Sequence, residues 1–424
     1  MSQISNLLKP SGLVRGMQRF DKSLFEKEIT VPYVSIKDVT FSSVIPILRK
    51  YFMKICNFKP VQNVDSACVV YLHPCIIGKW DDINDEDRII LKSFNITGDQ
   101  LYFKKITLKY DNFNVDDILK SVLPVEIDGI SSYTQIGHIV HVNLKEHLLP
   151  YKEVIGQILL DKIHNCRTVV NKASIIDNTY RNFKMELLCG DANMMTTVKQ
   201  NRCRFEFDFS KVYWNSRLST EHERIVKLLR PGDVLFDVFA GVGPFSIPSA
   251  KKKCHVYAND LNPESYKWLK HNAELNNVNP EYFCAFNKDG MDFIKQDLRQ
   301  NLLKHINKRD VYVTMNLPAL ACDFLKYFVG LYDERELDSI TNPPTMCVYC
   351  FAKGEDFESI TRNLINESLG RDMSSKIKLF PVRTVSNFKE MMRVIFKLDE
   401  ELLIKKTHIM KRKGEGDTYV VKKS

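Results

Sequence analysis

The sequence lacks long apolar runs and a regular cysteine framework. No uninterrupted apolar segment reaches the roughly 18 residues needed to cross a bilayer, so no membrane-spanning helix is expected. The 11 cysteines are an odd number, scattered from Cys56 to Cys350. This favours a reducing compartment over a disulfide-stabilised extracellular protein. The single Cys-x-x-Cys, Cys347–Cys350, lies in an apolar run without a second pair, so core thiols are a better interpretation than zinc ligands.

What is present is typical of a globular protein. The 424 residues are 44% hydrophobic and 27% charged, which excludes collagen-like and wholly disordered chains. At roughly 100–200 residues per domain, this length predicts about two to four domains. The net charge of +9 permits a polyanionic partner without establishing one. The first 20 residues are basic and free of acids, which is compatible with a mitochondrial presequence, and residues 401–424 carry seven Lys or Arg against three acids.

We divide the chain into three regions: 1–95, 96–200 and 201–424. The first region contains a helix-like segment at 41–54, and the second alternates strand-like runs with a helix that begins near Pro150. In the third region, Thr220-Glu-His-Glu223 predicts a capping box at the start of a helix.

The third region alternates apolar strand-like runs with helix-like segments. The runs lie at 234–238, 254–258, 282–286, 311–315 and 346–351. Such alternation predicts an α/β fold with a parallel, doubly wound, Rossmann-like sheet. Ligands of such sheets bind at the carboxyl ends of the strands.

Three loops after successive predicted strands form a candidate nucleoside site. Gly241 and Gly243 allow a sharp turn and close approach of a ligand to the backbone, because neither has a Cβ. Asp260, about 20 residues later, is placed to accept bonds from ribose hydroxyls, although it could also cap the next helix. Asp289, which precedes Gly290, can reach an adenine amino group. Together with the Asp-x-Phe-Ala-Gly-x-Gly form of the first loop, this set favours S-adenosylmethionine over NAD.

Two asparagine–proline segments compete for the catalytic position. Asn316-Leu-Pro-Ala319 follows the fourth strand, where Pro318 has no N–H for the sheet and Asn316 can aim its amide at a ligand. Amino-group methyltransferases carry an Asn-Pro-Pro-aromatic or similar tetrapeptide at this point. Asn342-Pro-Pro-Thr345 is closer in its letters, but it precedes the strand at 346–351 and would lie at the opposite edge of a parallel sheet. We interpret it as a helix-to-strand turn.

Four segments together resemble the eukaryotic and archaeal tRNA (guanine-37-N1) methyltransferases. They are Lys211-Val-Tyr-Trp-Asn-Ser-Arg217-Leu-Ser-Thr-Glu-His222, Asp237-Val-Phe-Ala-Gly-Val-Gly-Pro-Phe245, Asn259-Asp-Leu-Asn-Pro263 and Met315-Asn-Leu-Pro318. The resemblance implies an S-adenosylmethionine-dependent enzyme that methylates N1 of guanosine 37, next to the tRNA anticodon, and so supports reading-frame maintenance. It also implies smaller α/β domains that precede the methyltransferase domain and grip the anticodon loop and the folded L of the tRNA. One departure is Asn215-Ser-Arg217, where many members have proline before the arginine.

The resemblance assigns the cofactor contacts residue by residue. They are His222, Asp260, Leu261, Asp289, Gly290 and Asn316. Guanine N1 carries a proton at neutral pH, so methyl transfer requires a base and a stabilised O6. We expect Arg217 to be the cation at O6 and Asn316 the positioning group. Asp237 is the candidate base, with the alternative that it only holds the glycine loop; the donor is a sulfonium, so no metal is expected.

Two alternative functions remain at this stage. One is an aminocarboxypropyl transferase that acts on a hypermodified tRNA guanosine, and the other is a non-catalytic RNA-binding protein. The Asn316-Leu-Pro318 segment favours methyl transfer over the first, and the intact glycine loop argues against the second. We expect a monomer without membrane attachment, located in the cytoplasm and nucleus with a pool in the mitochondrial matrix.

Overall fold

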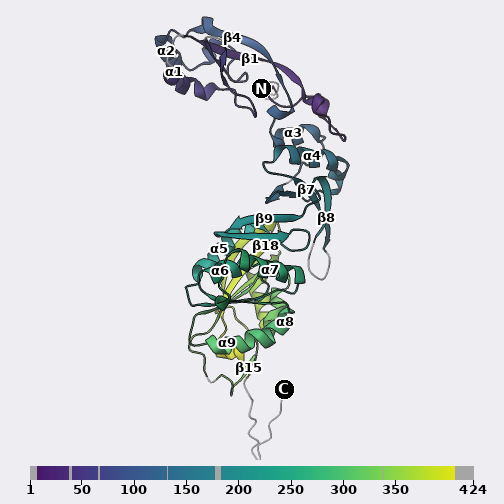
Figure 1. Cartoon of the computed structure of the whole chain (residues 1–424), viewed down its shortest axis with the longest axis vertical. Coiled ribbons are helices and arrows are strands. Elements are labelled where there is room, and N and C mark those ends of the chain that lie inside the picture. The colour runs from purple at the N-terminus through teal and green to yellow at the C-terminus, as the bar shows by residue number, and fades with distance from the viewer. Residues whose placement is uncertain are drawn as a thin grey trace, which may run out of the picture. The chain divides into compact units, whose positions relative to one another are not determined.

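The computed structural model describes residues 7–37, 41–64, 67–130, 132–176, 183–337 and 339–405 (Figure 1). The start of the presequence-like segment and most of the basic C-terminal stretch lie outside these ranges. The chain divides into two compact units, residues 1–174 with 185–193, and residues 175–184 with 194–424. Within the described residues, no helix is both long and apolar enough to cross a membrane.

Unit 1 begins with an antiparallel sheet of four strands in the order β2-β3-β1-β4. Its elements are β1 (Lys27–Ile36), α1 (Phe41–Leu48), β2 (Val61–Val64), β3 (Ala67–Tyr71), α2 (Asp85–Ser93) and β4 (Leu101–Leu108). β1 and β4 pair from Lys27↔Leu108 to Val34↔Leu101. The predicted boundary at residue 95 is therefore too early, because it separates two strands whose hydrogen bonds hold one sheet together.

The rest of unit 1 is a second α/β layer. Its elements are α3 (Val115–Val122), β5 (Tyr133–Ile136), β6 (Ile139–Val142), α4 (Lys152–Lys162), β7 (Thr168–Ile176) and β8 (Phe183–Gly190). The predicted helix is present, and its apolar positions Val154, Ile155, Ile158 and Leu159 are fully buried. It starts at Lys152 rather than Pro150, because Pro150 occupies the 3-10 turn Glu146–Tyr151 that leads into it.

Unit 2 contains the predicted doubly wound sheet. The strands follow the order β13-β12-β11-β14-β16-β18-β17. They are β11 (Val234–Asp237), β12 (His255–Asn259), β13 (Phe283–Phe286), β14 (Val311–Met315), β16 (Thr345–Lys353), β17 (Lys378–Ser386) and β18 (Lys389–Lys397). All five predicted strands are present and parallel to their neighbours. The antiparallel β17–β18 hairpin that extends the sheet was not predicted.

Helices and a two-stranded hairpin complete unit 2. They are β9 (Met195–Gln200), β10 (Cys203–Asp208), α5 (Ser219–Leu228), α6 (Ser246–Lys251), α7 (Pro263–Leu275), α8 (Gly290–Asp292), the π-helix η11 (Phe293–Leu298), α9 (Arg299–His305), the 3-10 helix η12 (Ala321–Tyr327), β15 (Tyr332–Asp333), α10 (Phe357–Leu369), α11 (Glu400–Leu403) and β19 (Ile404–Lys405). The predicted capping box is wrong. The 3-10 turn Ser216–Leu218 runs directly into α5, so Thr220 is not a helix cap.

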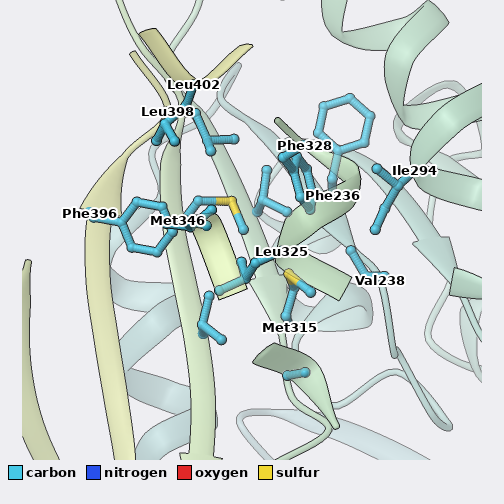
Figure 2. Close-up of a cluster of buried hydrophobic side chains, with 14 of the residues drawn as sticks. Phe236, Val238, Ile294, Met315, Leu325, Phe328, Met346, Phe396, Leu398 and Leu402 are labelled. Atoms are coloured by element: carbon cyan, nitrogen blue, oxygen red, sulfur yellow. The ribbon is translucent and has the colours of Figure 1, made fainter. Parts of the chain in front are cut away.

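One large apolar core fixes the sheet of unit 2 beneath its loops (Figure 2). Phe236 and Val238, at and just beyond the end of β11, pack with Met315 of β14 and Met346 of β16. Leu325 of η12 covers the same cluster. Because these side chains are fully buried, the carboxyl ends of β11 and β14 are held in fixed positions.

Candidate active site

The strand order of unit 2 places a crevice between β11 and β14. β12 and β13 extend the sheet on one side of β11, whereas β14 and β16 extend it on the other. Loops from the two sides therefore diverge at this point, and open α/β sheets bind ligands at such a switch point. The glycine loop follows β11 and the Asn316 segment follows β14, so the structure brings both to this edge.

The glycine loop has the predicted backbone conformation. Gly241 has φ +57° and Gly243 has φ +95°, in the left-handed region that favours glycine. A Cβ on Gly243 would lie 2.6 Å from Ile247, so this glycine permits close packing of α6. A Cβ on Gly241 would meet no atom within 4 Å. Gly241 thus faces open space, where a ligand can approach the backbone.

Asp260 lies just beyond β12 and is bonded to the glycine loop. One carboxylate oxygen accepts the Gly241 N–H at 2.8 Å, and the other accepts the Asn262 N–H at 2.9 Å. Asn262, not Asp260, caps α7, so the cap alternative is wrong. Burial raises the pKa of Asp260 to about 6. The carboxylate is only half-buried by accessible area, and each oxygen keeps a lone pair for a ligand hydroxyl.

Two asparagines that the sequence interpretation did not single out tie these loops together. Asn259 is fully buried, donates to Val238 O and Lys288 O, and accepts the Lys288 N–H. Asn287 donates to the carbonyls of Asp260 and Leu261. These bonds fix the loops after β11, β12 and β13 relative to one another. The only signal in the sequence was an Asn directly before Asp260.

The loop after β13 carries Asp289 and Gly290. Asp289 caps α8 by accepting the Met291 N–H at 2.8 Å. A Cβ on Gly290 would lie 2.9 Å from the rings of Phe239 and Phe324, so only glycine fits there. Leu261, on the neighbouring loop, is 44% exposed, which leaves an apolar surface for a planar base. These positions are compatible with the predicted adenine subsite.

Asn316 directly follows β14 and carries an unsatisfied acceptor. Its Oδ1 is buried and has no hydrogen-bond partner among the described residues. The segment behind it is anchored, because Pro318 O accepts the Phe351 N–H of β16 at 3.0 Å. A buried acceptor without a donor costs free energy, on the order of 1–3 kcal/mol, unless a ligand supplies the donor.

Asp237 ends β11 and is fully buried. Its oxygens accept hydrogen bonds from Ser246 of α6 at 2.6 Å and from Thr314 of β14 at 3.0 Å. Burial raises the pKa of Asp237 to about 7. This geometry favours the second sequence interpretation, in which Asp237 holds the strands and α6 together beneath the glycine loop.

Arg217 and His222 lie on one continuous segment that enters α5. Asn262 donates to Lys211 O at 2.8 Å, which fixes the start of this segment beside the Asp260 loop. Arg217 is exposed in the turn before α5. His222 is buried, its Nδ1 lies 2.7 Å from Gln200 Nε2, and its ring packs edge-on against Phe245 of the glycine loop. Burial lowers the pKa of His222 to about 3, so the imidazole is neutral at physiological pH.

Glu221 is a buried carboxylate to which the sequence interpretation gave no catalytic role. It pairs with Arg393 of β18, accepts the Tyr349 hydroxyl at 2.9 Å, and lies 3.2 Å from Arg224 Nε. Four residues separate it from Arg217 on the helical segment, which places both side chains on one side of it. No cue in the sequence distinguished Glu221 from Glu223, because the partners of Glu221 come from distant strands.

The second asparagine–proline segment lies at the opposite edge. β16 runs parallel to β14, and Asn342 precedes β16, so it lies at the amino end of the sheet. Its amide donates to Arg309 O at 3.2 Å and Asp310 Oδ1 at 3.0 Å, before β14. The prediction that this segment is a structural turn is confirmed.

The site geometry fits a nucleoside cofactor that carries an amino group. Gly241 leaves space, Asp260 offers carboxylate lone pairs at the rim, and Asn316 presents an acceptor in need of a donor. Among the described residues, no group of three or more His, Cys, Asp or Glu side chains is arranged to hold a metal ion. A doubly wound sheet with these loops at its switch point defines a Rossmann-like methyltransferase.

Comparisons with known proteins identify the family. The model of the TRM5/TYW2 methyltransferase domain matches residues 196–337, and that of the TYW2 N-terminal domain matches residues 115–193. The tRNA (guanine(37)-N(1))-methyltransferase of Drosophila melanogaster is 49% identical over 93% of this chain and 88% of its own length. The Mus musculus protein of the same name is 40% identical over 98% of this chain and 86% of its own. The chain belongs to the tRNA (guanine(37)-N1)-methyltransferase family and is an enzyme.

Solved structures agree with the fold. Trm5b from Pyrococcus abyssi matches 86% of this chain and 98% of its own with a TM-score of 0.57 and 21% identity. The aTrm5 structure determined with tRNALeu matches 87% of this chain and 99% of its own with a TM-score of 0.59 and 24% identity. At such identities the likeness concerns the fold alone.

Proposed function

We propose that this enzyme transfers a methyl group from S-adenosylmethionine to N1 of guanosine 37 in tRNA at the crevice between β11 and β14. When bound, S-adenosylmethionine supplies an electrophilic methyl group on a sulfonium. Asp260 would hold ribose hydroxyls, and the loop of Asp289, Gly290 and Leu261 would hold the base. His222 would act from behind the glycine loop through its contact with Phe245. The observation that carries the proposal is the buried, unpartnered Asn316 Oδ1 beside the glycine loop.

Arg217 and Asn316 would act on the target guanine. As N1 loses its proton, negative charge grows on O6, and a planar guanidinium can donate to that oxygen. Arg217 lies in the turn before α5, on the segment that Asn262 anchors beside the cofactor loops. Asn316 would orient the reacting groups from the end of β14.

Two carboxylates are candidates for the base that accepts the N1 proton. Asp237 has a pKa near neutrality, but it is enclosed by Ser246 and Thr314 in the core. Glu221 lies one helical turn after Arg217, and its oxygens face two arginines and a tyrosine. Asp237→Asn and Glu221→Gln separate them: the true base loses single-turnover rate at every pH, whereas the other variant keeps the rate of correctly folded protein.

The reaction is tested by nucleoside mass spectrometry of tRNA incubated with the enzyme and methyl-labelled S-adenosylmethionine. Methyl transfer labels N1 of guanosine 37, whereas aminocarboxypropyl transfer leaves the RNA without the labelled methyl group. A non-catalytic RNA-binding protein yields no modified nucleoside. Asn316→Ala is the control for activity that arises from a contaminant.

The finer substrate proposal is that unit 1 recognises the folded L of tRNA, while unit 2 acts on the anticodon loop. Unit 2 alone contains the proposed cofactor site, so unit 1 requires another role. Initial rates of the full chain on intact tRNA and on the isolated anticodon stem-loop test this. Equal rates would contradict recognition of the folded L. Varying the RNA is preferable to deleting residues 1–95, since that deletion removes β1 and leaves β4 without its partner.

Location and assembly are also proposals. The acid-free first 20 residues favour a mitochondrial pool beside cytoplasmic and nuclear pools. Fractionation of cells that express the tagged chain with and without these residues tests this. Light scattering tests whether the chain is a monomer.

A further inference from the structure

Two lysines face each other at the carboxyl edge of the large sheet. Lys353 at the end of β16 and Lys389 at the start of β18 are directly paired positions of an antiparallel ladder. Like charges in this position destabilise a sheet. Neither lysine forms an ion pair within the residues that the structure describes. Such a pair becomes favourable when an anion lies between the two ammonium groups.

An exposed aromatic ring lies beside this lysine pair. Phe388 occupies the turn between β17 and β18 and is 64% exposed. Its carbonyl accepts the Gly354 N–H at 3.0 Å, which fixes the turn against the end of β16. Lys389 Nζ also lies 3.9 Å from the centre of the Phe351 ring. We call Lys353, Phe388 and Lys389 the hairpin cluster.

The hairpin cluster is next to the proposed catalytic segment. Phe351 donates its N–H to Pro318 O, two residues after Asn316. Lys353 is two residues further along β16, roughly 7 Å from Phe351 at the rise of a strand. Phe351 and Lys353 share a face with Tyr349, which bonds Glu221 of α5. The cluster therefore lies on the sheet face that also receives the segment of Arg217.

We propose that the hairpin cluster binds the unpaired nucleotides that flank the target guanosine. Lys353 and Lys389 contact backbone phosphate, and Phe388 stacks on a neighbouring base. Single-stranded RNA is held by this combination of cations and aromatic rings. Two acids follow Lys353: Asp356 is occupied as the cap of α10, and Glu355 is exposed on the chain that leads to it. The proposal rests on the function proposed above, because that function supplies the RNA.

Steady-state kinetics with tRNA tests the proposal. Lys353→Glu is compared with Lys308→Glu, a control with the same charge change at an exposed position before β14, at the amino edge. Lys353→Glu is expected to raise KM for tRNA about tenfold and to reduce the salt dependence of log KM by about one unit of slope. Phe388→Ala is expected to raise KM roughly five- to a hundredfold, and Phe388→Tyr to restore it. Affinity for S-adenosylmethionine, measured by calorimetry, stays at the wild-type value in all four variants.

The proposal is overturned if Lys353→Glu and Lys308→Glu give the same KM and salt slope, or if Phe388→Ala behaves like wild type. Titration of a fluorescent anticodon stem-loop separates this inference from the proposed function. A wild-type chain that binds the stem-loop through Lys353 and Phe388 without methylating it would contradict the proposed function alone. A chain that methylates guanosine 37 with all variants at wild-type KM would contradict the hairpin cluster alone.

Discussion

Two asparagine–proline segments lie at opposite edges of one sheet. Asn342-Pro-Pro-Thr345 bonds the backbone and side chain of the segment before β14, and its amide has protein partners. Asn316-Leu-Pro318 follows β14, and its Oδ1 is buried without a partner among the described residues. The two segments are similar in composition and differ in what their surroundings leave unsatisfied.

This difference shows that the position of a short motif in the sheet determines its role. Parallel strands bring all carboxyl ends to one edge, so Gly241, Asp260, Asp289 and Asn316 converge although up to 75 residues separate them. A segment before a strand reaches the other edge, where it can only connect elements. Four changes test the contrast, from the largest expected effect to the smallest.

The largest effect is expected at Arg217. Arg217→Ala removes a donor to the charge that develops on O6, and loss of one such donor costs roughly a hundredfold or more in rate. Single-turnover methylation measures the rate, and calorimetry is expected to show cofactor affinity close to wild type. Methylation at the wild-type rate would mean that another group stabilises O6.

The next effect concerns cofactor affinity. Asp260→Ala removes a charge-assisted bond to ribose, which is worth on the order of 1.5–3 kcal/mol, so affinity for S-adenosylmethionine is expected to fall about ten- to a hundredfold. Part of this loss reflects the glycine loop, because Asp260 also accepts the Gly241 N–H. Asp260→Asn keeps an acceptor for that N–H and serves as the matched control. Wild-type affinity in Asp260→Ala would remove the carboxylate from the site.

A smaller effect is expected on stability at the buried end of β11. The folded chain holds the pKa of Asp237 at about 7, against 3.8 for a free carboxyl, so the unfolded chain releases its proton first. This contribution therefore destabilises the wild type progressively as pH rises from about 4 to 7. Asp237→Asn removes it, so the stability of the variant relative to wild type should increase between pH 5 and pH 8, on the order of 2 kcal/mol.

Thermal unfolding of the wild type and Asp237→Asn at both pH values measures this difference. Asp323→Asn, at an exposed carboxylate, is the control and should give the same difference at both values. A difference between wild type and Asp237→Asn that does not change with pH would mean that Asp237 ionises in the folded chain as it does in water.

The smallest effect is expected at Asn342. Asn342→Ala removes two exposed hydrogen bonds, so it should leave turnover unchanged and lower stability by at most about 1 kcal/mol. Methylation rate and thermal unfolding measure the two quantities. A large loss of rate would transfer the active site to the Asn-Pro-Pro segment and reverse the comparison.

Much of unit 2 could be predicted because its signals are local. The apolar run at 311–315 became β14 with the predicted bounds, and Gly241 has the left-handed backbone that its loop suggested. The capping box failed because a 3-10 turn before α5 occupies the position of the cap. The boundary at 95 failed because β4 pairs with β1, and sequence separation hides such a pairing.

The sequence by itself determined the class of fold, the family and the loops that meet at the carboxyl edge, because periodicity, turn residues and motif spacing are local properties of the chain. Tertiary structure decided which groups are left with unused bonding capacity. Asn259 binds three loops, Asp237 is enclosed by two hydroxyls, and Asn316 keeps a buried acceptor without a donor. The like-charged pair of Lys353 and Lys389 exists only because β18 returns antiparallel to β16. Hydrogen-bond saturation and charge pairing depend on neighbours that are distant in sequence, so only the folded chain reveals them.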